Sequence, residues 1–208
     1  AVAESDRRVI ADTFARQLEY APVLAVADSP QAGAEDRALL RQLHPTARQV
    51  GAGSAELAEV ALAGFDPAAA AAAQHPACAR LPQEDQEAGV ATLVWRRRRP
   101  FHPERLDEAL EKIACSALRS RGRFVDSFGP WLAALPEAAW DMVPPERRVA
   151  AALDWDPVHG DRGQHLVFTG PRVDHSDLTG LLDSCLLTPA EEAAGAAAWR
   201  HPATGFDA

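Results

Sequence analysis

Residues 95–106, WRRRRPFHPERL, join a short apolar run to the start of a helix, and they organise the C-terminal half of the chain. The run from Val90 to Trp95 predicts a β-strand. Pro103 suits the first turn of a helix, where the N–H that proline lacks would have no intrahelical partner. Acidic residues follow at the positive end of this helix and Lys112 lies near its negative end. The stripe expected to be buried is Leu106, Leu110 and Ile113.

Two strands are predicted downstream of this helix. Residues 118–128 predict a strand with an interruption at Gly122. Residues 164–169 predict a second strand, which Gly170-Pro171 is expected to end. Between them, residues 131–140 fit either a strand or a short helix.

The Pro144-Pro145 pair predicts a break in the chain, and the last helix is the clearest element. Asp174 and Asp177 have the spacing of a capping box, with Asp in place of the usual Glu, and Thr188-Pro189 is expected to stop the helix. Its apolar face is predicted to comprise Leu178, Leu181, Leu182, Cys185 and Leu186. The order of elements predicts an α+β domain, a ferredoxin-like split β-α-β sandwich.

The N-terminal part of the chain alternates helices with apolar strands. The predicted elements are a helix over 4–20, a strand over 23–27, a helix over 34–43, a strand over 46–50 and a helix opened by Ser54. This alternation is typical of the end of a doubly wound α/β domain. Six alanines and then an acidic, polar stretch predict a linker over 66–88. The expected domains are therefore residues 1–65 and residues 89–208.

Composition narrows the class of protein. The chain has 208 residues, of which 47% are hydrophobic and 25% charged, and its net charge is -9. An acidic protein of this kind is not expected to bind DNA or a membrane through its whole surface. No apolar run approaches 18 residues and no signal-peptide pattern opens the chain, so a cytoplasmic protein is expected. The three cysteines fit no zinc or redox spacing, and Cys115 and Cys185 are expected to be small core residues.

Three stretches in order resemble the C-terminal domain of CobW-type GTPases. The first is RRPFHPERL over 98–106, and the second is WDP over 155–157 followed by GDRGQHLVFTG over 160–170. The third is LDSCLLT over 182–188. The resemblance implies that residues 1–65 are the end of the family's P-loop GTPase domain. GTP, Mg and Zn are implied only for an intact family member, and no cofactor is expected in this chain.

The resemblance also suggests a degenerate nucleotide contact at Asp28. In the family, a strand like residues 23–27 ends in the guanine-specificity motif N-K-x-D, and here Ala25 and Val26 stand at the Asn and Lys positions. An ordinary turn residue is the alternative interpretation of Asp28. The family's phosphate loop and its Cys-x-Cys-Cys motif are absent, and Gly51 to Ser54 fits a helix N-cap rather than a phosphate turn.

Two functional interpretations follow. In the first, the chain is a CobW-like binding module for a client, either a metalloprotein that receives zinc or cobalt or a ribosome hibernation factor. In the second, it is a fragment of a GTP-hydrolysing metallochaperone whose P-loop lies upstream of Ala1. A degenerate relic without a role is a third possibility. No catalytic residue and no metal ligand is assigned in the chain.

The basic run at the end of the first C-terminal strand is a further candidate binding site. Arg96, Arg97, Arg98 and Arg99 are predicted to point alternately to opposite faces, so that two could meet an anionic partner. A solvated edge with ion pairs is the alternative. His75 with Cys78, and the histidines at 159, 165 and 175, supply too few converging ligands to predict a zinc site. Glu191 and Glu192 are assigned to a polar tail.

Overall fold

In the computed structural model the chain forms two compact units. The residues described are 13–14, 17–18, 21–64, 66–69, 86–123, 132–153, 155–157, 160–161 and 163–194. The first unit comprises Ala1–Leu93, Ala117–Arg119 and Phe168–Val173. The second comprises Val94–Ser116, Ser120–Val167 and Asp174–Ala208. Residues 70–85 of the predicted linker and most of the predicted first helix lie outside the described residues. The end of the predicted linker is a short strand, Gln86–Glu87.

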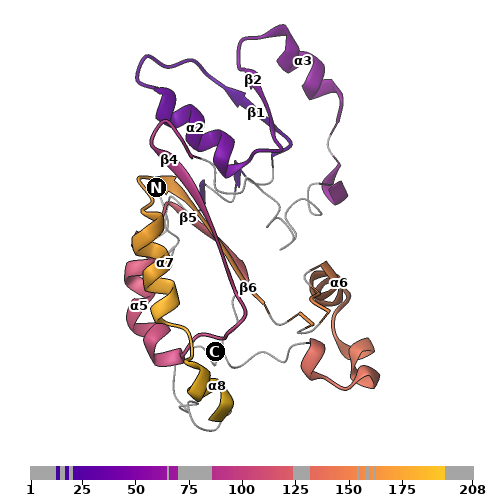
Figure 1. Ribbon diagram of the computed structural model, residues 1–208. Helices are drawn as coiled ribbons and strands as arrows, with labels where there is room; N and C mark the ends of the chain where they lie inside the picture. The colour runs from indigo at the N-terminus through magenta and orange to yellow at the C-terminus, as the bar shows by residue number, and fades with distance from the viewer. Residues whose placement is uncertain are drawn as a thin grey trace, which may run out of the picture. The chain divides into compact units, whose positions relative to one another are not determined.

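Two parallel strands and two helices form the N-terminal part of the first unit (Figure 1). The elements are β1 (Val23–Val26), α2 (Ala34–Leu43), β2 (Arg48–Gly51) and α3 (Ala55–Leu62). The helix predicted over 34–43 has the bounds expected of it. The Ser54 hydroxyl accepts a hydrogen bond from the backbone N–H of Leu57 and so caps α3, as its position predicted.

A four-stranded sheet runs through the rest of the fold. Its strands lie in the order β3 (Gln86–Glu87), β4 (Val90–Arg97), β6 (Gln164–Pro171) and β5 (Arg119–Arg123). Strand β6 is inserted between β4 and β5, although β4 and β5 are consecutive around one helix, which is the split β-α-β arrangement. Helices α5 (Pro103–Cys115) and α7 (His175–Ser184) lie side by side in the second unit (Figure 1). The α+β class is confirmed.

The two packed helices follow from local sequence chemistry. Pro103 is the first residue of α5, and Leu106, Ala109 and Ile113 are buried on one face. The Asp174 carboxylate accepts a hydrogen bond from the N–H of Asp177 at 2.9 Å and caps α7. Cys185 is buried as expected, but Cys115 is exposed, because it ends α5 off the buried stripe.

Helix α7 is shorter than predicted, because tertiary pairing competes with it. Leu186 forms a β-bridge with Phe101 and therefore leaves the helix. The N–H of His102 donates to the carbonyl of Cys185 at 2.8 Å, and the N–H of Leu187 donates to that of Pro100 at 2.9 Å. Thr188 and Pro189 were expected to stop α7, but α7 ends earlier and a further helix, α8 (Pro189–Ala194), begins directly after Thr188.

Other boundaries differ for similar reasons. Strand β6 includes Gly170 and ends at Pro171, so it continues past the predicted last residue, Thr169. Gly170 lies against the backbone of Leu118, where a Cβ would come within 2.7 Å of the nitrogen. The stretch predicted as strand or helix contains the 3-10 helices η2 (Leu132–Ala134) and η3 (Glu137–Met142). The Pro144-Pro145 pair starts a helix that was not predicted, α6 (Pro145–Leu153).

A buried polar network joins α2 to the sheet within the first unit. The Thr92 hydroxyl donates to Gln42 Oε1 at 2.9 Å and lies 3.1 Å from the Thr169 hydroxyl. The Gln42 side-chain amide donates to the carbonyl of Val90 at 3.2 Å. Gln42, Thr92 and Thr169 are at most 1% exposed. Because unpaired buried polar groups are costly, these bonds select one placement of α2 on β4.

We expect Thr92→Val to lower the free energy of unfolding by about 1–3 kcal/mol, because Gln42 Oε1 would lose its donor inside the protein. Chemical denaturation measures the change. Ser176→Ala, at an exposed position on α7, is the control and should stay within about 0.5 kcal/mol of the parent. Equal stability of the Thr92→Val protein and the parent would contradict the importance of the network.

Candidate functional site

The end of β4 carries an aromatic and ionic cluster that involves the first and third motifs. The rings of Trp95 and Phe101 stack with centroids 5.3 Å apart and an interplanar angle of 3°. The guanidinium carbon of Arg97 lies 5.4 Å from the centroid of the Trp95 ring. Asp183 of α7 accepts from Trp95 Nε1 at 2.9 Å and from Arg97 Nη2 at 2.6 Å. One carboxylate thereby satisfies a buried indole and a guanidinium together.

The remaining arginines of the basic run also have contacts inside the second unit. Arg98 forms an ion pair with Asp156 at 2.8 Å, and Arg99 Nη1 donates to the carbonyl of Leu187 at 2.7 Å. Arg96 Nε lies 3.5 Å from His165 Nε2. Three of the four arginines are therefore held by a carboxylate or a carbonyl. Partner binding through this run remains a prediction, and exposed Arg96 and Arg98 are the members accessible for it.

The second motif builds a turn that supports the start of η2. The Asp161 carboxylate accepts from the N–H groups of Leu132 at 3.1 Å and Ala133 at 3.0 Å. Gly160 has φ of +63°, and a side chain there would clash with Ala133. The Gln164 amide donates to the carbonyl of Arg99. Asp161 and Gln164 therefore bind residues distant in the chain, at the start of η2 and at Arg99. These contacts were not predicted from the sequence.

Glu191 is a structural residue rather than part of a polar tail. Its carboxylate binds Arg105 Nη2 at 2.7 Å and accepts from the N–H of Thr188 at 2.7 Å, while Thr188 Oγ1 accepts from the N–H of Glu191 at 3.3 Å. Thr188 and Glu191 thus form a capping box for α8, which the T-x-x-E spacing could have revealed. The bonds from Arg105 and Thr188 lower the pKa of the Glu191 carboxyl from 4.5 to about 2.

Among the described residues, the buried cysteine is not activated and no cluster of metal ligands is present. Burial raises the pKa of the Cys185 thiol, which therefore stays protonated, and its Sγ lies 3.2 Å from the carbonyl of Leu181. The described residues contain no group of three or more His, Cys, Asp or Glu side chains placed to hold a metal ion. His75 and Cys78 lie outside the described residues.

Asp28 lies just beyond the carboxyl end of β1, where it is exposed. Parallel pairing of Val26 with Gly51 places the loop that ends at Ser54 at the same edge of the two strands. The N–H of Ala52 donates to the carbonyl of Val26 at 2.9 Å and ties the two loops together. Ligands of open α/β sheets bind at this edge. A guanine contact at Asp28 remains a prediction.

Comparison with known proteins decides the family. Residues 90–186 match the model of the cobalamin synthesis protein CobW C-terminal domain. These residues are a CobW-type C-terminal domain. The match begins at the first residue of β4 and ends at Leu186, the residue that pairs with Phe101. The resemblance drawn from the three motifs is thus confirmed.

Curated relatives of the CobW-type chain extend the match beyond that domain. A zinc chaperone of Mycobacterium tuberculosis is 31% identical over 212 residues, covering 90% of this chain and 52% of the relative. The zinc-regulated GTPase metalloprotein activator 1 of Dictyostelium discoideum is 26% identical over 237 residues, covering 95% of this chain and 48% of the relative. The chain therefore spans about half the length of these relatives. No solved structure matches it significantly. No helix among the described residues is long and apolar enough to cross a membrane.

Replacing Asp183 by Ala should remove the acceptor for both Trp95 and Arg97. We expect the free energy of unfolding to fall by about 1.5–3 kcal/mol, the range for hydrogen bonds to charged groups. Denaturant unfolding followed by tryptophan fluorescence gives the value. Asp107→Ala, at an exposed position on α5, should change stability by less than about 0.5 kcal/mol. Similar losses for both variants would contradict the special role of Asp183.

The lowered pKa of Glu191, about 2, predicts a defined acid dependence. A carboxyl group with a lowered pKa in the folded state adds stability that is complete above its ordinary pKa and lost as pH falls through the folded value. Stability of the parent protein should decline between pH 4.5 and about 2 in part through Glu191. Glu191→Gln should lack this part of the decline, while Glu192→Gln should keep it. Denaturation midpoints at several pH values test both; identical profiles for all three proteins would refute the assignment.

Proposed function

We propose that this chain is the partner-binding half of a CobW-type metallochaperone. It contacts a client in metal homeostasis, either a metalloprotein that receives zinc or cobalt or a ribosome hibernation factor. The names of the two relatives, a zinc chaperone and a zinc-regulated GTPase metalloprotein activator, favour zinc as the cargo metal.

The proposal is supported by the contacts of the motif side chains, which are made within the chain. Asp183, Asp161 and Gln164 all contact other parts of the same chain. Within the described residues these contacts build a scaffold, and the thiol of Cys185 is buried and protonated. A domain of this kind contributes a shaped surface to a larger process and leaves bond-breaking chemistry to other residues.

A second candidate function is supported by the length of the relatives. In this alternative the chain is part of a GTP-hydrolysing metallochaperone, and a P-loop with Cys-x-Cys-Cys lies in residues that precede Ala1. The position of Asp28 at the carboxyl edge of β1 favours it, because this is the edge at which α/β domains bind ligands. Reading the coding sequence upstream in frame discriminates between the two. Both candidates assign partner binding, rather than catalysis, to residues 90–186.

To test this, the tagged chain is expressed in its own host, which is grown either with sufficient zinc or in zinc limitation. The proteins that are purified together with the chain are then identified. We expect one metalloprotein or ribosome-associated protein to be retained, with recovery changing between the two zinc conditions. Asp183→Ala, which perturbs the scaffold, should weaken retention. Absence of any specific partner in both conditions would overturn the proposed function.

A further inference from the structure

The segment between β5 and β6 exposes three large apolar side chains. Met142 of η3 is 86% exposed, Val149 of α6 is 51% exposed and Trp155 is 41% exposed. We call these three residues the Met142 patch. Isolated apolar residues on a surface are normal, whereas contiguous exposed apolar patches mark interaction sites. The three residues lie within one stretch, residues 142–155.

The elements that carry the Met142 patch are held to one another. Trp155 packs edge-on against Trp140 of η3, with ring centroids 5.6 Å apart. Arg148 of α6, next to Val149, donates to Asp141 of η3 at 3.0 Å. These contacts hold the elements that carry the three apolar side chains. Less conformational entropy of this segment would therefore be lost when a partner binds.

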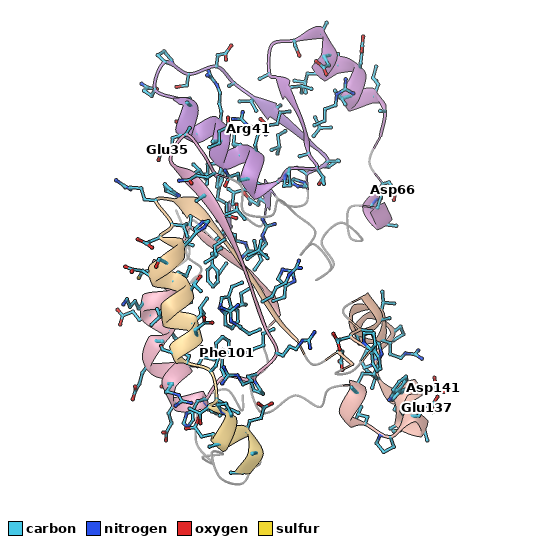
Figure 2. The ribbon with its side chains drawn as sticks, in the orientation of Figure 1. Glu35, Arg41, Asp66, Phe101, Glu137 and Asp141 are labelled. Atoms are coloured by element: carbon cyan, nitrogen blue, oxygen red, sulfur yellow. The ribbon has the colours of Figure 1, made fainter. Side chains whose placement is uncertain are left out.

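Carboxylates border the patch. Glu137 and Asp141 lie on the same short helix as Met142 and are exposed; both are labelled in Figure 2. The side chain of Asp141 is 96% exposed, so its ion pair with Arg148 leaves most of the carboxylate open to solvent. Exposed ion pairs of this type contribute little and are readily exchanged. The chain as a whole carries a net charge of -9, which favours a basic partner.

We propose that the Met142 patch binds a basic amphipathic segment of a partner protein, with its apolar side chains on Met142, Val149 and Trp155 and its lysines or arginines on Glu137 and Asp141. This rests on the proposed function and locates the surface that serves it. Charge complementarity decides the occupant. RNA would be repelled by the carboxylates, and a dimer of the chain would be recognised by light scattering.

A pair of defined peptides tests the proposal with the full chain. The probe is a fluorescein-labelled helical peptide of leucine and lysine, and its counterpart carries glutamate in place of lysine. Fluorescence anisotropy should show binding of the lysine peptide alone. Met142→Ser removes apolar area and Asp141→Asn removes charge, and each should weaken binding by about fivefold. Leu62→Ser, a variant of a side chain 88% exposed on α3, should bind like the parent.

Three outcomes would overturn the proposal: equal binding of the two peptides, an equal loss in Leu62→Ser, or a dimer in light scattering that Met142→Ser abolishes. Circular dichroism confirms that the variants fold, which is expected because both altered side chains are exposed. The same variants separate this inference from the proposed function. A host partner retained equally by the parent and by Met142→Ser would overturn the patch and leave the proposed function standing.

Discussion

The second unit depends on the carboxylate of Asp183. It accepts hydrogen bonds from the indole of Trp95 and the guanidinium of Arg97, two side chains from the same face of β4. Trp95 is 2% exposed, so its N–H must find an acceptor within the protein. These two bonds from Asp183, near the end of α7, therefore tie that helix to β4. The stacking of Trp95 on Phe101 then brings the chain round towards α5.

The return of the chain after α7 extends the same packing. The bridge between Phe101 and Leu186 closes beside the bonds of His102 with Cys185 and of Leu187 with Pro100. Arg105 donates to the carbonyl of Leu186 and to the carboxylate of Glu191, which belongs to the capping box of α8. The first and third motifs therefore contact each other through these hydrogen bonds.

The proposed function uses exposed side chains of the described residues. Most arginines of the basic run bind other groups of the same chain. Met142, Val149 and Trp155, in contrast, are exposed. The proposed occupant, a basic amphipathic segment, follows from the acidic border of that face.

The sequence by itself determined the α+β class, the CobW-type family, α2 to the residue and the caps at Ser54 and Asp174. These follow from local patterns of apolar, capping and motif residues. Only the tertiary structure decided that α7 stops at Ser184, that Gly170 lies within a strand and that the arginines bind Asp183, Asp156 and Leu187. The reason is that each depends on a partner many positions away in the chain, and local propensity carries no information about which distant group competes for a hydrogen bond. The exposure of Met142 likewise could not be read from its sequence neighbours.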